Sequence, residues 1–275
     1  MKIYLSRLII ISFFILFTAG CQKHDESGNA GQLAVRFSHH VDGSPLNVDD
    51  MRYTNAAGNQ YEVSEIQWFV SDLTLHMKNG DKIALDQDAF AHYVDTDLPQ
   101  THLWKIKKGI PDGIYSAISI TFGIKGEKNM PYIFTDSPES EMIWPINLGG
   151  DQGGYHYMKL NGFWINTAGE RTPFNFHLGV GQERDDTGKI TGFVQNWIEV
   201  IIPGSDFEID KGELKIINLV MNVEQWFSSP NIYDHNFHGA KIMQNQEAMQ
   251  MGTENGKSGV FTVSSIDQVD SFDVK

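Results

Sequence analysis

Apolar and polar residues alternate along most of the chain, which is the pattern of β-strands with one buried face. Between residues 61 and 77 the apolar positions follow two phases that break near Ser71-Asp72. Lys78-Asn79-Gly80-Asp81 is a turn signal, and residues 82–85 answer it, so a hairpin is expected there. The same pattern predicts further strands at residues 33–37, 92–94, 102–106, 115–124, 155–164, 174–180, 193–202 and 214–223.

Helical periodicity is scarce and is best between residues 240 and 251. Ile242 and Met249 are seven residues apart and share a helix face, and Asn255-Gly256 is a plausible stop signal. Many short strands separated by turns are typical of a β-sandwich or barrel. We therefore predict an all-β fold, a single β-sandwich domain over residues 33–262 with a short C-terminal helix and long loops, followed by an acidic tail at 263–275.

The N-terminal residues have the order of a secretory signal. Lys2 and Arg7 precede an uncharged apolar run at residues 8–17, which is too short to remain in a bilayer as a spanning helix. Small residues, Thr18-Ala19-Gly20, then lead directly to Cys21. This order predicts a lipoprotein signal peptide over residues 1–20.

Cys21 is then expected to be the lipidated first residue of the mature chain. It is the only cysteine, so no internal disulfide can form. Residues 21–32 are polar or small and are expected to act as a tether. The predicted location is the outer membrane, on its periplasmic or cell-surface face, with the lipid at Cys21 as the contact to the membrane.

Charge excludes one class of partner. Removal of residues 1–20 takes away two of the 21 basic residues and none of the 35 acidic ones, so the mature chain has a net charge of 19 − 35 = −16. Phosphate binding requires clustered Lys and Arg, so no nucleic acid is expected as a partner.

Motifs for catalysis are missing from the sequence. It contains no Gly-x-Ser-x-Gly and no His-Glu-x-x-His, and it has no cysteine nucleophile within the domain. We therefore name no catalytic residue and expect a binding protein rather than an enzyme.

Histidine and methionine are more informative. His156 and Met158 are two residues apart and would share one face of a strand, whereas His177 would face away from Phe174 and Phe176. Imidazole and thioether ligands together suit copper, especially Cu(I). The alternatives are ordinary: a histidine on a strand is more often a hydrogen-bonded polar residue, and tryptophans such as Trp144 are more often packing residues.

Several stretches resemble the MbnP-like copper-binding family, and together they extend over roughly residues 33–262. Their order and spacing carry more weight than any single motif. The stretches are Phe37-Ser38-His39-His40-Val41-Asp42-Gly43, Tyr53 to Val63, Trp68 to Leu73, Gly113 to Ile124, Gly153 to Gly162, Phe176-His177-Leu178-Gly179, and Asn222 to Phe227 with Ile242 to Asn245.

The resemblance implies a β-sandwich protein that binds copper, as Cu(I) or Cu(II), outside the inner membrane. It implies His39, His156 and His177 as ligands, with Met158 as a fourth. It also implies a partner similar to a di-haem cytochrome c peroxidase, which in some members oxidises a tryptophan near the metal to kynurenine. Trp144 is our prediction for that tryptophan.

Two functions follow from the sequence. The first is a lipid-anchored copper-binding protein that sequesters or delivers copper. The alternative is a metal-free surface lipoprotein that binds a glycan or a partner protein through the same β-sandwich, with exposed aromatic side chains between Trp144 and Trp164 as the contact surface.

Overall fold

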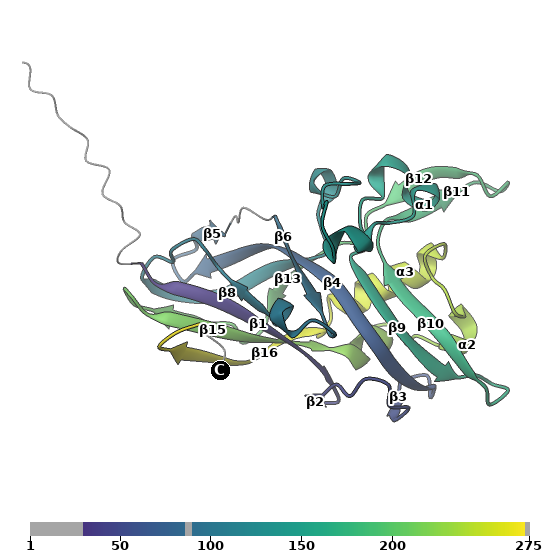
Figure 1. Ribbon diagram of the computed structural model, residues 1–275, viewed down its shortest axis with the longest axis horizontal. Helices are drawn as coiled ribbons and strands as arrows, with labels where there is room; N and C mark the ends of the chain where they lie inside the picture. The colour runs from purple at the N-terminus through teal and green to yellow at the C-terminus, as the bar shows by residue number, and fades with distance from the viewer. Residues whose placement is uncertain (1–29, 86–89, 273–275) are drawn as a thin grey trace, which may run out of the picture.

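The computed structural model describes residues 30–85 and 90–272. Two β-sheets pack face to face, and a two-stranded hairpin projects from one end (Figure 1). The predicted signal peptide and Cys21 lie outside the described residues. Within the described part of the chain, no helix combines the length and the apolar character needed to cross a membrane.

The larger sheet is built around one long strand, β4, with strand order β10-β9-β4-β8-β13. The shorter strands β3, β5 and β6 also pair with β4, and β14 pairs with β8. All these pairs are antiparallel. The bounds are β3 (Tyr53–Thr54), β4 (Gln60–Met77), β5 (Lys82–Ala84), β6 (Ala91–Asp95), β8 (Gly113–Phe122), β9 (Met158–Ile165), β10 (Arg171–Leu178), β13 (Ile198–Ile202) and β14 (Phe207–Ile209).

The predicted break in β4 is present as a bulge. The register between β4 and β8 shifts between Ser71 and Thr74, and Asp72 has a φ of 49°. A bulge adds a residue to one strand and so changes the phase of the alternation. The two apolar phases of the sequence therefore correspond to the two parts of β4, one beside β9 and the other beside β8.

The smaller sheet joins the two ends of the domain. Strand β1 pairs in parallel with β15, and β16 pairs with β15 in the antiparallel direction. The bounds are β1 (Gln32–Val41), β2 (Ser44–Pro45), β7 (Leu103–Lys105), β15 (Leu214–Asn222) and β16 (Phe261–Val269). Because β16 continues to Val269, residues 263–269 belong to this sheet and not to the predicted acidic tail. Their side chains are mostly polar, and it is the backbone pairing with β15 that holds them in the sheet.

Trp68 fills the space between the two sheets. It is fully buried, and its ring lies 5.3 Å from Phe37 of β1, 6.2 Å from Phe122 of β8 and 5.5 Å from Phe261 of β16. Large aromatic side chains contribute most of the apolar area in such a core. The β-sandwich predicted from the alternation of the sequence is thus confirmed.

The predicted strand at 193–202 is divided between two sheets. Strand β12 (Ile190–Val194) pairs with β11 (Gly181–Arg184) in the projecting hairpin, whereas β13 joins the larger sheet. Asn196 lies in the connection and donates to the backbone oxygen of Gly179 at 2.8 Å. The connection, Gln195-Asn196-Trp197, contains no glycine or proline, so the sequence carried no turn signal for this division.

The C-terminal helix begins later than predicted. Helix α3 (Gln246–Gly256) starts after Asn245, whose side chain accepts a hydrogen bond from the backbone N–H of Ala248. This N-cap fixes the start of the helix. The other helices are α1 (Ile146–Gly149) and α2 (His235–His238), with 3₁₀ turns at Pro99–His102, Gly126–Lys128, Glu139–Met142, Gly150–Gln152 and Val223–Phe227.

Candidate metal centre

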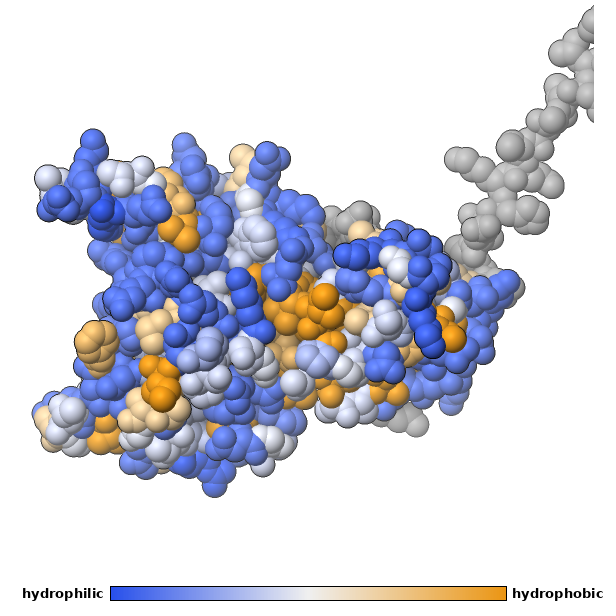
Figure 2. Space-filling model, turned by 180° about the vertical axis from the view of Figure 1, so that it is seen from behind, coloured by the Kyte–Doolittle hydropathy of each residue, from blue (hydrophilic) through white to orange (hydrophobic). Residues whose placement is uncertain are grey.

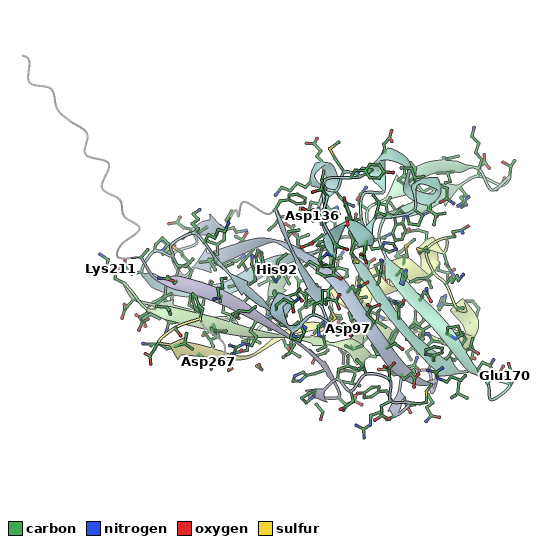
Figure 3. All side chains as sticks on the ribbon, viewed as in Figure 1. His92, Asp97, Asp136, Glu170, Lys211 and Asp267 are labelled. Atoms are coloured by element: carbon green, nitrogen blue, oxygen red, sulfur yellow. The ribbon has the colours of Figure 1, made fainter. Side chains whose placement is uncertain are left out.

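His156 and His177 lie side by side at one end of the β9–β10 hairpin. Their ring centroids are 5.1 Å apart, the rings are nearly perpendicular, and the two residues are only 5% and 7% exposed. His177 belongs to β10, and His156 lies two residues before β9 begins. In Figure 3, Glu170 marks the turn at the opposite end of this hairpin, and Asp136 marks the loop segment that leads towards Trp144.

A short backbone pairing places Trp144 beside His156. Ile143 and Tyr155 form an isolated antiparallel bridge, and the backbone N–H of Trp144 donates to the oxygen of Gly154 at 2.8 Å. The indole therefore packs edge-on against the imidazole, with ring centroids 4.6 Å apart. The structure thus brings together three of the residues predicted from the sequence.

Hydrogen bonds fix which nitrogen of each imidazole carries the proton. His156 Nδ1 lies 2.9 Å from the backbone oxygen of Met142, and a carbonyl can only accept, so Nδ1 carries the hydrogen. His177 Nε2 lies 2.8 Å from Oδ1 of Asn161 and donates to it. The other nitrogens, His156 Nε2 and His177 Nδ1, are buried and have no hydrogen-bond partner.

Both imidazoles are neutral at ordinary pH. Burial lowers the pKa of His156 to about 3, partly opposed by the hydrogen bond to Met142. Burial, followed by the charges of His156 and Lys159, lowers the pKa of His177 to about 3. A neutral imidazole keeps a lone pair on its free nitrogen, which is the form that binds metals.

The separation of the rings fits one metal ion between them. With metal–nitrogen bonds of about 2 Å and a near-tetrahedral angle, the two ring centres would lie roughly 5 Å apart. The observed separation is 5.1 Å. Two unpartnered buried nitrogens are otherwise unfavourable, since each loses its bond to water without replacement.

Glycines hold the indole of Trp144 in place. A Cβ at Gly149 would lie 2.6 Å from Cδ1 of the indole, and a Cβ at Gly179 would lie 2.4 Å from Cε3. A Cβ at Gly153 would lie 3.0 Å from the same Cδ1 atom. These close approaches require glycine, and they leave Trp144 only 2% exposed, with its Nε1 buried and unpartnered.

His39 does not join the pair. Its Nε2 accepts a hydrogen bond of 3.0 Å from the indole N–H of Trp68, in the core between the two sheets. An indole can only donate, so this bond occupies the lone pair that a metal would need. This corrects the expectation that His39 is a third ligand, because the alternation of β1 directs it into the core.

Met158 also lies away from the pair. It packs in the main core and is opposite Leu178 in the β9–β10 register, whereas His177 is opposite Lys159. Successive residues of a strand point to opposite faces, so Met158 and His177 are on opposite faces of the sheet. The same-face expectation for His156 and Met158 is wrong because the backbone leaves the strand conformation at Tyr157.

The spacing of potential ligand atoms agrees with a site of two histidines without His39. Among the described residues, the only group of three or more His, Cys, Asp or Glu side chains with ligand atoms within 4.8 Å of one another is Glu65, Asp95 and Asp97. The three predicted histidines therefore do not form a three-ligand site.

The sequence analysis missed Asn161 and the glycines around Trp144. Asn161 shares the face of Lys159, two residues earlier on β9, so the same period-2 pattern could have placed it beside His177. Gly149-Gly150 and Gly153-Gly154 lie between Trp144 and His156 in the sequence, which is a signal for close backbone approach. The role of the Met142 carbonyl had no sequence signal, because every residue has one.

The aromatic surface expected for glycan binding is not present. Trp144 and Trp164 are 2% and 4% exposed, and no tryptophan is among the large exposed hydrophobic side chains of residues 30–85 and 90–272. The face in Figure 2 is mainly hydrophilic, with a hydrophobic area near its centre. Buried indoles cannot stack on a sugar, so Trp144 and Trp164 do not provide the expected contact surface.

Comparisons with known proteins agree with the fold. The family model for MbnP matches residues 30–250. The solved structure of MbnP from Methylosinus trichosporium superposes with a TM-score of 0.53 at 14% identity, covering 86% of this chain and 98% of that chain. A search of curated proteins finds no match.

Burial of His39 predicts a specific loss of stability in acid. Burial, followed by His102 and His40, lowers its pKa in the folded protein to about 3, from 6.5 in the unfolded chain. Below pH 6.5 the unfolded chain therefore binds a proton that the folded protein does not, and stability falls as the pH falls. In His39→Gln, which keeps an acceptor for Trp68, the free energy of unfolding should fall less steeply between pH 6 and 4, by up to about 1.4 kcal/mol per pH unit.

Urea denaturation at several pH values measures this difference. The two proteins should have parallel stabilities between pH 7.5 and 8.5, where the histidine is neutral in both states. Equal slopes below pH 6 would show that His39 is not held neutral by burial.

Proposed function

Because the chain belongs to the MbnP family, we propose that it is a copper-binding protein that holds one ion between His156 and His177. The observation that carries the proposal is the pair of adjacent buried imidazoles, each with one nitrogen bound by the protein and the other unpartnered. Such fixed tautomers are typical of metal-ligating histidines. The protein would sequester or deliver copper rather than catalyse a reaction.

The donor set favours copper over hard cations. Calcium and magnesium prefer several oxygen ligands, whereas two imidazoles suit copper and zinc. The charge of Lys159 acts on both histidines, and this cation disfavours a highly charged ion. A site of two neutral nitrogens beside a lysine is therefore best matched to Cu(I), with Cu(II) bound more weakly.

Trp144 supplies a further ligand once it is oxidised. An indole N–H cannot bind a metal, but opening of the ring between Cδ1 and Cγ, followed by loss of Cδ1 as formate, turns Nε1 into an arylamine with a lone pair. Two molecules of hydrogen peroxide would convert Trp144 to N-formylkynurenine and two waters, and hydrolysis would then release formate and leave kynurenine. The position of the indole, 4.6 Å from His156 between ring centroids, supports this role.

The oxidant would be supplied by a partner similar to a di-haem cytochrome c peroxidase. Such a partner requires an extracytoplasmic location, which agrees with the signal peptide predicted at residues 1–20. We propose that lipidation of Cys21 attaches the protein to the outer membrane, where the copper site faces the periplasm or the cell surface.

Removal of either histidine tests the copper site. The purified protein should hold about one copper per chain, and His156→Ala or His177→Ala should lose at least 10–100-fold in affinity. His76→Ala is the control, because His76 is a partly buried strand histidine at the C-terminal end of β4, outside the site. Elemental analysis gives the stoichiometry, and competition with a copper chelator gives the affinity.

Thermal unfolding gives a second readout of the same binding. At a free copper concentration 100 times the Kd, binding should stabilise the folded protein by about 2.7 kcal/mol, and at the same copper concentration either histidine variant should gain only about 1.4 kcal/mol or less. Copper retained at full stoichiometry by the His156→Ala/His177→Ala double variant would contradict the proposed site.

Mass spectrometry of protein isolated from its own cells tests the oxidation of Trp144. The peptide that contains Trp144 should have lost one carbon and gained one oxygen relative to the sequence. Trp226 is the control, since it is fully buried in the core but has no role in the site. An unmodified Trp144 in copper-loaded protein would show that the two histidines bind copper without it.

A further inference from the structure

His177 Nε2 is the first member of a series of hydrogen-bonded polar side chains that crosses three strands. His177 Nε2 lies 2.8 Å from Asn161 Oδ1, and Asn161 Nδ2 donates to Glu65 Oε2 at 3.1 Å. The strand registers explain this arrangement. Asn161 of β9 is opposite Glu65 on β4, and His177 of β10 is its diagonal neighbour on the same face.

Glu65 determines the orientation of the Asn161 side-chain amide. A carboxylate oxygen accepts hydrogen bonds, so the amide nitrogen of Asn161 must face Glu65. The amide oxygen then faces His177 and requires a hydrogen on Nε2. The proton of His177 is therefore excluded from Nδ1, which keeps its lone pair on the side away from Asn161.

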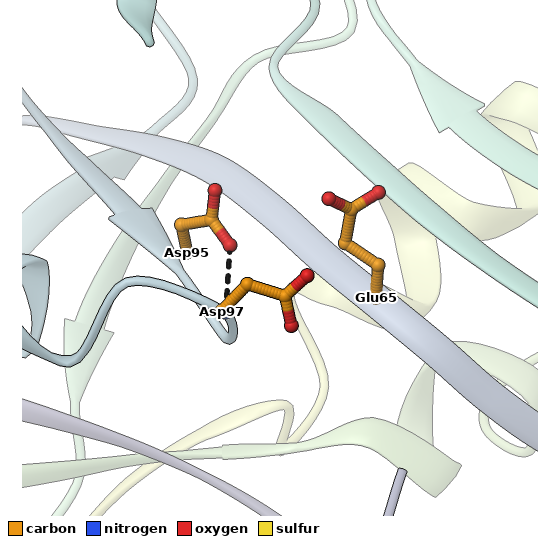
Figure 4. A group of neighbouring side chains, drawn as sticks. All are labelled: Glu65, Asp95 and Asp97. Carbon is orange, nitrogen blue, oxygen red and sulfur yellow. Dashed lines mark hydrogen bonds between the residues drawn. The ribbon is translucent and has the colours of Figure 1, made fainter. Parts of the chain in front are cut away.

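Two further carboxylates lie close to Glu65. Figure 4 shows Glu65 on β4 beside Asp95 and Asp97. Asp95 is held by the hydroxyl of Tyr93 at 2.6 Å, by Gln67 at 3.2 Å and by the backbone N–H of Asp97 at 2.8 Å. Burial, followed by the charges of Asp95 and Asp97, raises the pKa of Glu65, whereas the hydrogen bond from Asn161 stabilises its carboxylate form.

Lys159 lies on the same face of the sheet, and its charge is opposite to that of Glu65. Its positive charge disfavours protonation of both His156 and His177. It also donates to the backbone oxygen of Glu141 at 2.8 Å, which draws its ammonium group towards the segment before Trp144. Burial is the main reason that both histidines stay neutral, and Lys159 adds to it. Lys159 offers no acceptor for their N–H groups, so the tautomer of His177 depends on Asn161.

We propose that Asn161, oriented by Glu65, is the positioning residue that holds His177 as the Nε2–H tautomer and so presents Nδ1 as the ligand atom. The consequence for copper rests on the proposed function, whereas the tautomer of the metal-free protein does not. Residues of this kind, which bind a ligating histidine from behind, raise metal affinity by about 10–100-fold.

The tautomer can be measured directly by ¹⁵N NMR of the metal-free, full-length protein. His177 in the unmodified sequence should show a protonated Nε2 and an unprotonated Nδ1. Asn161→Leu removes the acceptor and should give a mixture of tautomers or the Nδ1–H form. Asn161→Asp keeps an acceptor oxygen and should retain the original tautomer.

Asn175→Leu is the matched control. Asn175 is the same residue type, lies directly opposite Asn161 in the β9–β10 register, and is similarly half-buried. The structure shows no side-chain hydrogen bond from it to His177, so the tautomer should not change. If Asn161→Leu does not fold, Glu65→Gln serves instead, since a neutral amide there no longer dictates the direction of Asn161 and should also yield a mixture.

Copper affinity, measured by chelator competition, separates this inference from the proposed function. Asn161→Leu should bind copper about 10–100-fold more weakly, and Asn175→Leu should be unchanged. An unchanged His177 tautomer in folded Asn161→Leu, or an equal change in Asn175→Leu, overturns the inference. If the tautomer responds as expected but the unmodified protein binds no copper, the positioning role stands and the proposed function fails.

Discussion

The burial of two imidazoles against each other removes both from water. Neither can take up a second proton there and become charged without a partner for that charge. His156 and His177 meet this constraint by staying neutral, with one N–H donated to a fixed oxygen of the protein in each case. Each then retains one lone pair with nothing to bind. The proposed copper site follows from this, because these two lone pairs are the donors that the ion would take up.

One face of the β9–β10 hairpin packs in the main core, and the other carries residues of the site. Met158 and Leu178 face the main core, whereas Lys159 and His177 face the other side. The pairing that stabilises the sandwich therefore also fixes the distance and angle of the site. Trp144 comes from a different segment, and glycine backbones rather than side chains fix its place. Such packing would reduce the ordering that binding of the proposed ion requires.

Much of the fold could be predicted from period-2 alternation, because burial on one face dictates it. The break in β4 was visible as a change of phase at Ser71-Asp72 and is present as a bulge. The course of residues 263–269 was not visible, since β16 is held by backbone bonds to β15. In the site, His156, His177 and Trp144 were named from the sequence. His39 was misplaced because alternation tells which residues turn inward but not which partner they meet, and in the core that partner is Trp68.

X-ray absorption spectroscopy of the copper-loaded protein tests the central claim most directly, because it reports the atoms bound to the metal. The account predicts imidazole scattering from two histidines with copper–nitrogen bonds of about 2 Å and no sulfur ligand. It also predicts that one imidazole signal disappears in His177→Ala. A sulfur scatterer, which Met158 could supply only if it left the core, or a first shell of oxygen without imidazole, would contradict the account.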